Sequence, residues 1–369
     1  MKILLTGGGT GGHLMPLLAV VSELKKLGKE QEASKLEFLL LSPDSEFNKS
    51  ISDAGIQIKI IKAGKLRRYF SWENFVDIFK IPVGIIQSLY HLSKFKPNLV
   101  FSKGGFASIP PIVAAWILRI PIITHESDLI PGLANKIIAR FSSKILISFS
   151  ATEKYFNKSK VTLTGNPVRS DISEGNSENA FKFFELSFSV PIILIFGGSQ
   201  GAQKINEMIL EILPELTKKY QVIHQCGTKN YDKIKSAVSD LKPEDLEKYR
   251  LYPYLDKEMK DAYAIADIVI ARAGANSISE IAVLNKPNIL IPLSTSASNH
   301  QFKNAEFFVE KDASLMIDET VSNSDDLLDC IFKILADENL QNKMKKSLQS
   351  LSSQNSARKI AEEIMNVAQ

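Results

Sequence analysis

The sequence contains few cysteines and no apolar segment long enough to cross a membrane. Its 369 residues include only Cys226 and Cys330, and neither lies in a CxxC or a Cys/His spacing. This pattern excludes a disulfide framework and a cysteine-ligated zinc site, and it predicts two buried thiols in a reducing compartment. The nearest approach to a membrane span, residues 106–118, contains two prolines and falls short of the ~20 apolar residues that a bilayer requires.

The sequence also lacks a large excess of charge of either sign and an acidic metal-binding motif. The 45 Lys and Arg residues against 41 Asp and Glu residues give a net charge of +4, which is too small an excess to predict nucleic-acid binding. No Asp-x-Asp pair occurs anywhere in the chain, so no metal is expected. The first apolar stretch gives way to glycine at Gly7, too early for a signal peptide, and none is expected.

What is present is the composition of a large globular protein. The chain is 44% apolar and 23% charged, and its length suits two domains rather than one. Apolar runs of strand length alternate with helical patterns, which predicts βαβ units and parallel sheets buried on both faces. The expected strands are 3–6, 38–41, 56–61, 99–102, 122–125 and 145–148, then 192–196, 222–226, 252–255, 268–271 and 289–292.

The pattern starts again after Thr164, so the predicted fold class is α/β with two doubly wound, Rossmann-like domains. We expect the first domain to cover residues 1–168 and the second 169–344. Residues 165–169 have turn chemistry suited to a hinge, and the polar stretch 170–179 is expected to be a loop. A last helix, 345–369, is expected to pack back on the first domain.

A glycine-rich loop follows the first expected strand. Gly7 to His13 reads GGGTGGH, and a helix pattern follows it. Such a loop lets the backbone and the helix N-terminus approach phosphate oxygens. Gly7, Gly9 and Gly12 also satisfy GxGxxG, so a NAD- or FAD-dependent oxidoreductase stays open as an alternative. A tight turn alone would explain the glycines but not His13.

Two similar loops follow strands of the second half. Gly197–Ala202, GGSQGA, lacks the GK[ST] ending of an ATPase loop, but Ser199 could donate to a phosphate. Ala273–Glu280 starts a helix near Ala275 whose amides could meet a diphosphate. Glu280 could accept hydrogen bonds from two ribose hydroxyls, or it could simply be an exposed helix residue.

Two further features have an open interpretation. His125-Glu126-Ser127-Asp128 follows a strand, where ligands of α/β sheets bind, and it is either a general-base site or a satisfied polar cluster. Residues 70–96 mix aromatic and basic side chains, which suits either an anionic membrane surface or a pair of core helices broken at Pro82. The membrane interpretation concerns Arg67, Arg68, Phe75, Ile78, Phe79, Lys80 and Ile85.

Six motifs occur in the order that a known family shows. They are GGTGGHxxP from Gly8, HESDxxxGxxNK from His125, GNPVR from Gly165, GGSQGA from Gly197, AGAxxxSE from Ala273 and HQxxNA from His300. Together they resemble the MurG family of glycosyltransferases, from residue 3 to about 310. The resemblance implies a GT-B fold of two Rossmann-like domains facing a cleft, with an acceptor and membrane-side first domain and a donor-binding second domain.

The resemblance also implies an activity and its setting. Members transfer N-acetylglucosamine from UDP-N-acetylglucosamine to the muramyl 4-hydroxyl of undecaprenyl-pyrophosphoryl-MurNAc-pentapeptide, converting lipid I to lipid II in peptidoglycan synthesis. This implies no cofactor, a peripheral position on the cytoplasmic face of the bacterial inner membrane, an anionic membrane surface as a partner, and cell-wall synthesis or division proteins as further partners. A GT-B epimerase or hydrolase that uses the same nucleotide sugar is the alternative closest in fold.

Site residues follow from the resemblance position by position. It implies that Ser199 and Arg169 face the diphosphate, that the Leu255 backbone reads uracil, and that Glu280 holds the ribose. The other implied donor contacts are Thr10, Gly11, Gly12, Asp128, Ala275, Asn276, Ser277 and Gln301. Asp128 stands where some members have asparagine, and His300 stands where others have a second glutamine.

The chemistry requires a base for the acceptor hydroxyl and a stabiliser for the leaving diphosphate, because an α-linked donor gives a β-linked product in one displacement. Without an acidic metal motif, helix amides, Ser199 and Arg169 are expected to meet the diphosphate. His13 and Glu126 are both candidates for the base, and the sequence does not choose between them.

Overall fold

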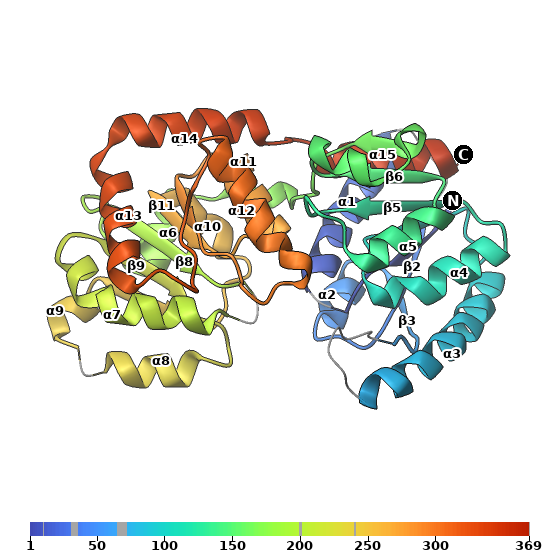
Figure 1. Ribbon diagram of the computed structural model, residues 1–369, viewed down its shortest axis with the longest axis horizontal. Coiled ribbons are helices and arrows are strands. Elements are labelled where there is room, and N and C mark those ends of the chain that lie inside the picture. Colours follow the sequence, from blue (N-terminus) through green and yellow to red (C-terminus); the bar gives the residue numbers. More distant parts are fainter. Residues whose placement is uncertain (10, 31–35, 65–71, 199–200, 240, 369) are drawn as a thin grey trace. The chain divides into compact units, whose positions relative to one another are not determined.

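The structure is a computed structural model that describes residues 1–9, 11–30, 36–64, 72–198, 201–239 and 241–368, with the backbone course alone for 72–78 and 297. Its contacts divide the chain into two compact units (Figure 1). Unit 1 consists of Met1–Arg169 together with Ser353–Gln369, and unit 2 consists of Ser170–Ser352.

Unit 1 is built on a seven-stranded sheet in the order β3-β2-β1-β4-β5-β6-β7, and all of its pairings are parallel. The strands are β1 (Lys2–Thr6), β2 (Glu37–Ser42), β3 (Gln57–Ile60), β4 (Leu99–Ser102), β5 (Ile122–Glu126), β6 (Lys144–Ile147) and β7 (Val161–Leu163). The central strands are buried on both faces, so their sequences are apolar throughout rather than alternating.

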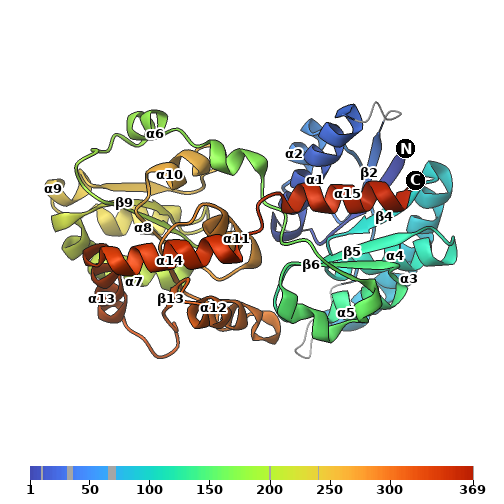
Figure 2. The same ribbon diagram turned by 90° about the horizontal axis from the view of Figure 1, so that it is seen from above.

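Helices cover both faces of this sheet. Leu5 and Leu40 face α1 (Gly11–Glu30) and α15 (Ser356–Ala368), whereas Leu4 and Leu39 face α3 (Trp72–Phe95), α4 (Ile109–Ile117) and α5 (Leu133–Phe141). Figure 2 shows α15 running alongside α1, far from it in sequence. A short α2 (Asn48–Asp53) and 3₁₀ turns at Phe106–Ser108, Ser150–Tyr155 and Lys158–Lys160 complete unit 1.

Unit 2 repeats the plan with a six-stranded parallel sheet in the order β10-β9-β8-β11-β12-β13. The strands are β8 (Ile192–Phe196), β9 (Gln221–Gln225), β10 (Tyr249–Tyr252), β11 (Ile268–Ala271), β12 (Asn288–Leu290) and β13 (Leu315–Met316). The helices are α6 (Ser177–Phe184), α7 (Gln203–Lys219), α8 (Tyr231–Val238), α9 (Pro243–Leu246), α10 (Met259–Ile265), α11 (Ala275–Val283), α12 (His300–Glu310), α13 (Ser324–Ala336) and α14 (Glu338–Leu351), with 3₁₀ turns at Ser170–Glu174 and Ala297–Asn299.

The two faces of the second sheet have different cores. Ile193 and Ile195 pack with α7 and α13, while Phe196 on the opposite face lies edge-on to Tyr263 of α10. The strand order 3-2-1-4-5 in both sheets is that of a Rossmann fold, and the prediction of two doubly wound parallel-sheet domains is confirmed.

Several expected elements differ from the structure. The strand expected at 252–255 lies at Tyr249–Tyr252, and the short edge strands β7 and β13 were not expected. The stretch 170–179, expected to be a loop, contains a 3₁₀ turn and the start of α6. Pro82 lies within one continuous helix, α3, rather than between two helices.

The helix expected at 345–369 is also two helices. α14 ends at Leu351 and α15 begins at Ser356, and the connection contains Asn355 in a left-handed conformation (φ 68°). The Ser-Ser-Gln-Asn connection is rich in residues that favour turns over helix interiors, so the chain turns here and α15 joins unit 1.

Candidate active site

The glycine-rich loop of unit 1 lies where ligands bind in sheets of this topology. It follows β1, which is flanked by β2 on one side and by β4 on the other, so the connections leave β1 and β4 in opposite directions. α1 begins at Gly11, and a Cβ there would lie 2.9 Å from the Phe47 ring, so any other residue would require this ring to move. Gly12 is exposed, and Thr10 lies outside the described residues.

His13 is held in the tautomer that a general base needs. Its Nδ1 lies 3.1 Å from the carbonyl oxygen of Lys103, which can only accept, so Nδ1 carries the hydrogen and the lone pair of the neutral ring is on Nε2. The ring fits between two glycines. A Cβ on Gly8 would lie 2.6 Å from Cδ2 of His13, and a Cβ on Gly105 would lie 3.3 Å from its Nε2.

Lys103 is a buried lysine that the sequence analysis did not single out. It directly follows β4, it is 1% exposed, and its pKa is lowered to about 7 by burial, against the attraction of Glu126 and Asp128. Its Nζ donates to Nδ1 of His125 (2.8 Å), to Oδ1 of Asn166 (2.9 Å) and to the Ser127 hydroxyl. The available signal was Ser102-Lys103-Gly104-Gly105, a polar residue and two glycines directly after an apolar strand.

His125 is a satisfied polar residue rather than a base. It is completely buried, and its Nε2 donates to the Gly165 carbonyl at 2.9 Å, so its Nδ1 is the acceptor for Lys103. Burial and the nearby Lys103 charge hold the pKa of His125 well below its usual range, against the hydrogen bond to the Gly165 carbonyl, which raises it. Of the two interpretations of this motif, the structure favours the polar cluster for His125.

Glu126 accepts hydrogen bonds that hold the turn containing Asp128. Its Oε1 accepts from the Asp128 amide (2.9 Å), and its Oε2 accepts from Nδ2 of Asn135 (2.8 Å). Burial, followed by the negative charge of Asp128, raises the pKa of Glu126 to about 7. Both oxygens of Glu126 are therefore engaged within the protein, whereas Asp128 is half-buried.

The first glycine loop of unit 2 lies at the equivalent position after β8. Gly198 and Gly201 have positive φ values of 88° and 75°, and a Cβ on Gly201 would overlap the Cys226 carbonyl. Gln225, at the end of β9, donates to the Gly198 carbonyl (3.3 Å) and accepts from the Leu255 amide (2.9 Å). The amide of Leu255 is thus already used within the protein. Ser199 lies outside the described residues.

The second loop of unit 2 leads from β11 into α11. Gly274 precedes the helix with an extended backbone, and Asn276 and Ser277 in the first turn are half-buried. The amides of a first helical turn have no acceptor within the helix and suit an anion. Ala275 is buried, and its carbonyl accepts from the Ser279 hydroxyl at 2.6 Å.

Glu280 is not a simple exposed helix residue. It is half-buried, and its Oε2 accepts from the hydroxyl of Tyr263 at 3.1 Å. Tyr263 is fully buried on α10, so it fixes the carboxylate of Glu280. The sequence analysis missed Tyr263, because no local pattern joins two residues on different helices.

Residues after β12 complete this end of the second sheet. Gln301 accepts from the Leu293 amide (3.0 Å), and Asn304, on the same helix, donates to the Ala273 carbonyl (3.1 Å). Arg272 pairs with Glu319 at 2.6 Å and donates to the Ile291 carbonyl at 3.0 Å. These contacts join α12 and the end of β12 to the loop before α11.

The predicted site residues thus fall into two groups. Gly11, Gly12, His13, Glu126 and Asp128 lie at the carboxyl end of the first sheet, whereas Leu255, Ala275, Asn276, Ser277, Glu280 and Gln301 belong to unit 2. Arg169 is the last residue of the first segment of unit 1. Within the described part of the chain, no three His, Cys, Asp or Glu side chains are grouped as a metal site would require.

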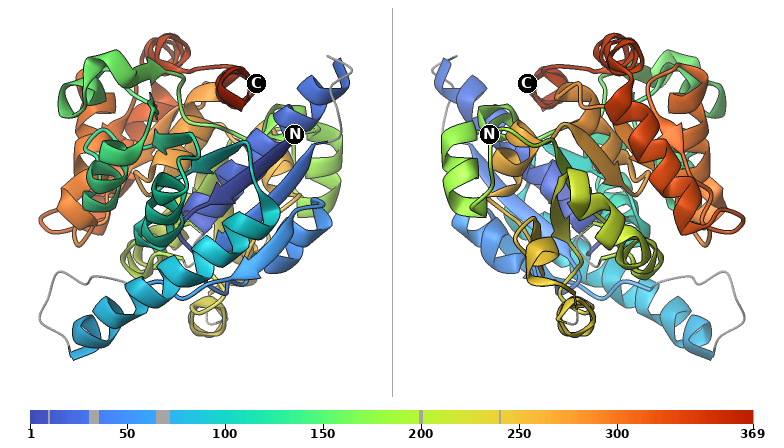
Figure 3. Two further views of the ribbon diagram at one scale, coloured as in Figure 1. Left: turned by 90° about the vertical axis from the view of Figure 1, so that its right-hand side faces the viewer. Right: turned by 90° about the vertical axis from the view of Figure 1, so that its left-hand side faces the viewer.

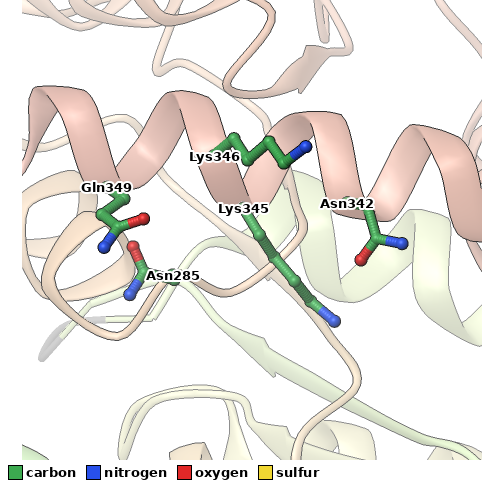
Figure 4. A pocket seen from close by; sticks show the side chains of 5 residues that line it. All are labelled: Asn285, Asn342, Lys345, Lys346 and Gln349. Atoms are coloured by element: carbon green, nitrogen blue, oxygen red, sulfur yellow. The ribbon is translucent and has the colours of Figure 1, made fainter.

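A pocket elsewhere in unit 2 is separate from this site. It is lined by Asn285, Asn342, Lys345, Lys346 and Gln349 (Figure 4). Asn285 follows the C-terminal end of α11, whereas the candidate site is at the N-terminal end, about 13 Å away at 1.5 Å per residue. None of the residues that line it was predicted to bind the donor.

Family models match both halves of the chain. The glycosyltransferase family 28 N-terminal domain matches residues 3–147, and the glycosyltransferase family 28 C-terminal domain matches residues 192–364. These ranges contain the loops after β1, β4, β5, β8 and β11.

Curated relatives match along most of their length. A protein of Clostridium perfringens (strain SM101) is 43% identical over 89% of both chains, and one of Lachnospira eligens is 42% identical over 91% of both. Both are named UDP-N-acetylglucosamine–N-acetylmuramyl-(pentapeptide) pyrophosphoryl-undecaprenol N-acetylglucosamine transferase.

Solved structures share the fold at lower identity. Acinetobacter baumannii MurG matches with a TM-score of 0.74 and 23% identity over 99% of both chains. The UDP-GlcNAc 2-epimerase of Neisseria meningitidis, bound to UDP-GlcNAc, matches with a TM-score of 0.70 and 15% identity over 99% of this chain and 100% of that one. A transferase and an epimerase therefore share this fold, and the fold alone does not separate these two activities.

The sequence relatives do separate them, because the identity of 42–43% extends over about nine tenths of the chain and the relatives are named as transferases. The resemblance to the MurG family is confirmed, and the chain belongs to glycosyltransferase family 28.

Proposed function

We propose that this chain is the transferase that moves N-acetylglucosamine from UDP-N-acetylglucosamine to the 4-hydroxyl of the muramyl residue in undecaprenyl-pyrophosphoryl-MurNAc-pentapeptide, the step from lipid I to lipid II in peptidoglycan synthesis. The observation that carries the proposal is the 42–43% identity to transferases of this name over about nine tenths of the chain.

The donor side of the reaction is assigned to unit 2. The first turn of α11, Ala275 to Ser277, offers amides to the diphosphate, and Glu280, held by Tyr263, accepts from the ribose hydroxyls. The carbonyl of Leu255 reads uracil and Gln301 contacts the sugar. Ser199 and Arg169 add a hydroxyl and a guanidinium to the diphosphate, which carries two negative charges in the donor and gains a third as its bond to C1 breaks.

The acceptor side is assigned to unit 1, with His13 as the base. Nε2 of His13 takes the proton of the 4-hydroxyl while the oxygen attacks C1 of the donor sugar, and the bond from C1 to the diphosphate oxygen breaks. The configuration at C1 inverts and UDP leaves. His13 is preferred to Glu126 because both carboxylate oxygens of Glu126 already accept hydrogen bonds from Asp128 and Asn135.

Transfer of radiolabelled N-acetylglucosamine to a short-chain lipid I analogue tests this proposal directly. A thermal-shift screen separates the alternatives, since a ligand that binds the native state raises the Tm. UDP should raise it, whereas NAD should not. Stabilisation by NAD with no sugar transfer would favour the oxidoreductase, and release of free epimerised sugar without an acceptor would favour the epimerase.

A second part of the proposal is that unit 1 touches the membrane through α3, the light-blue helix in the left view of Figure 3. Along this helix Phe79, Val83, Ile86 and Tyr90 are 73, 41, 67 and 63% exposed. Spacings of three and four residues place them on one face. Ile85, predicted to insert, is half-buried, and Ile86 replaces it on the exposed face.

This apolar face supports peripheral binding, because the proposed acceptor substrate carries a polyprenyl tail that lies in the bilayer. Every helix among the described residues is too short or too polar to cross a bilayer. Trp116 and Ile117, at the end of the neighbouring α4, are also exposed. Lys80 lies on α3, whereas Arg67, Arg68 and the side chains of Phe75 and Ile78 lie outside the described residues. The bilayer surface that meets this face is the cytoplasmic one, where the nucleotide sugar is available.

Vesicle sedimentation tests the membrane contact. Replacing Arg67, Arg68 and Lys80 with glutamate should reduce binding to anionic vesicles by about 1 kcal/mol per residue, while transfer to a water-soluble acceptor analogue remains nearly intact. A triple variant of exposed lysines in unit 2, K229E/K233E/K235E, has the same change in net charge and should bind as wild type does. Equal binding by both variants would place the membrane face elsewhere.

A further inference from the structure

Lys103 is a lysine that the proposed reaction does not use, buried at the centre of the acceptor-side site. Three separate segments contact its Nζ: His125 at the end of β5, Ser127 in the following turn, and Asn166 in the connection after β7. A lysine that is 1% exposed is uncommon, because burial of an ammonium group without compensation is costly.

The contacts of this lysine suit an ammonium group. An ammonium group has three N–H donors, and here three groups that can accept surround it. His125 must be an acceptor at Nδ1, because its Nε2 hydrogen goes to the Gly165 carbonyl. A neutral amine has only two hydrogens to donate, so the Ser127 hydroxyl would have to turn and donate to its lone pair.

The titratable groups around Lys103 are two carboxylates and two histidines. Glu126, on β5, and Asp128, in the turn after it, both attract its positive charge. His125 is neutral, and His13 of α1 touches Lys103 through the backbone carbonyl. Glu126 and Asp128 lie within one turn, and the negative charge of Asp128 adds to burial in raising the pKa of Glu126.

We propose that Lys103 is a positioning residue of the acceptor-side site: its ammonium group fixes His125 and the turn at Ser127, and it supplies the positive charge that lets Glu126 and Asp128 lie ionised in the same turn. This inference rests on the proposed function for its kinetic consequence. Lys103 does not touch the substrate, and it acts through the position and the charge of Asp128.

The proposal predicts a dependence on pH with a known direction. The pKa of Lys103 is about 7, and so is that of Glu126. Because lysine is charged below its pKa and glutamate above it, both groups are charged together only in a narrow range around neutrality. In Lys103→Met, Glu126 loses the positive charge that lowers its pKa, so the pKa of Glu126 rises. The acid limb of kcat/KM for the acceptor should then move to higher pH by about one unit or more.

A double-mutant cycle in the full-length protein tests this mechanism, with the lipid I analogue as acceptor. Lys103→Met should lower kcat/KM for the acceptor at least tenfold at pH 7. In an Asp128→Asn background, where the repulsion is already relieved, the same replacement should cost less than threefold. Equal losses in both backgrounds at every pH would overturn the proposal and leave Lys103 a support of the fold.

Two further variants control the experiment. Lys286, in unit 2, is a partly buried lysine that donates to the Ala264 and Ala266 carbonyls and is remote in sequence from the Lys103 cluster, so Lys286→Met should leave the pH profile unchanged. If Lys103→Met does not fold, Ser127→Ala keeps the charge and removes one acceptor. It should move the alkaline limb to lower pH, because the ammonium is less well held, and an unmoved limb would contradict the proposal.

A readout without substrate separates this inference from the proposed function. In an NMR titration of ¹³Cε-lysine-labelled protein, the Lys103 signal, identified by its absence in Lys103→Met, should titrate far below the other lysines and shift to lower pH in Asp128→Asn. Absence of sugar transfer by the wild type would refute the function only. A Lys103 signal that is insensitive to Asp128→Asn would refute the charge coupling, whatever the activity.

Discussion

The two units have the same strand order, yet the carboxyl ends of their sheets are occupied by different chemistry. In unit 1 this edge holds the ionisable side chains of His13, Lys103, Glu126 and Asp128, and two of these, Lys103 and Glu126, are buried. In unit 2 it holds glycine turns and the first turn of α11, with a single carboxylate, Glu280, in the predicted site.

The difference teaches that topology decides where a ligand binds, while the loops decide what happens to it. Titratable groups with shifted pKa values suit the transfer of a proton, whereas fixed amides and helix ends suit the holding of phosphates. On this basis we infer that unit 1 activates the acceptor and that unit 2 holds the donor. The following predictions test that division, from the largest expected effect to the smallest.

The most severe loss is expected from His13→Ala. Removing a general base typically costs 10²–10⁴-fold in rate, so kcat should fall by about that factor while the KM for the donor changes little. The comparison variant is Glu126→Gln, whose side-chain oxygen can still accept from the Asp128 amide, and it should retain most of the activity. The reverse result, an active His13→Ala and an inactive Glu126→Gln, would make Glu126 the base.

An effect on binding rather than on rate is expected in unit 2. Glu280→Gln removes a charge-assisted hydrogen bond to ribose worth roughly 1.5–3 kcal/mol, so the KM for the donor should rise by about ten- to a hundredfold. Tyr263→Phe, which only frees the carboxylate, should raise it by about fivefold. An unchanged donor KM in Glu280→Gln would remove Glu280 from the donor site.

A smaller effect is expected on thermal stability: neutralising one carboxylate should stabilise unit 1 and destabilise unit 2 near neutral pH. The pKa of Glu126 is raised to about 7, so its contribution to stability is complete below its unfolded value of about 4.5 and is lost as the pH rises through 7. Glu126→Gln should therefore unfold as wild type does at pH 4.5 and at a higher Tm at pH 8. The gain should be about 1–3 kcal/mol, or about 2–6 °C.

Glu319 in unit 2 is the matched control for this measurement. Burial would raise its pKa, but hydrogen bonds from Ser294 and Arg272 outweigh burial and the pKa is lowered. The contribution of Glu319 to the stability of the folded state is present above its unfolded pKa and is lost as the pH falls through its lowered folded pKa. Glu319→Gln should consequently lower the Tm at pH 7 and have less effect near pH 4. Equal pH dependence of both variants in a thermal-denaturation series would contradict the comparison.

The smallest effect is expected from chelation. Because the chain has no Asp-x-Asp pair, we expect helix amides, Ser199 and Arg169 to neutralise the leaving diphosphate. Exhaustive treatment with EDTA should leave the rate of sugar transfer within twofold. Loss of activity that magnesium restores would mean that a metal, rather than unit 2 alone, meets the diphosphate.

Much of this architecture could be predicted because its signals are local. Strands such as Leu99–Ser102 and Ile192–Phe196 are buried on both faces, so they are apolar at every position. The loops after β1 and β8 could be recognised by their glycines, some of which lie where a Cβ would meet another group, as at Gly11 and Gly201. Weakly buried edge strands gave no such signal. Tyr249–Tyr252 is largely half-buried and includes a charged residue, so the prediction placed this strand at residues 252–255 instead.

The rest of the site could not be predicted, because it depends on contacts between distant residues. The partners of Lys103 lie 22, 24 and 63 positions along the chain, and only the folded sheet brings them to one ammonium group. Tyr263 reaches Glu280 across two helices in the same way. The tautomer of His13, on which the choice of base depends, is set by the carbonyl of a residue 90 positions away.

The return of α15 to unit 1 has a consequence for how the protein is made. Ile360 and Ile364 are fully buried against α1 and the first sheet, and Ser353 donates to the Thr164 carbonyl. These residues follow all of unit 2, so a ribosome completes unit 2 before it supplies the last helix of unit 1. Domains usually mature on the ribosome in the order in which they emerge. Here the unit begun first is finished last, and until then the unfinished face of its sheet is a surface that a chaperone can recognise.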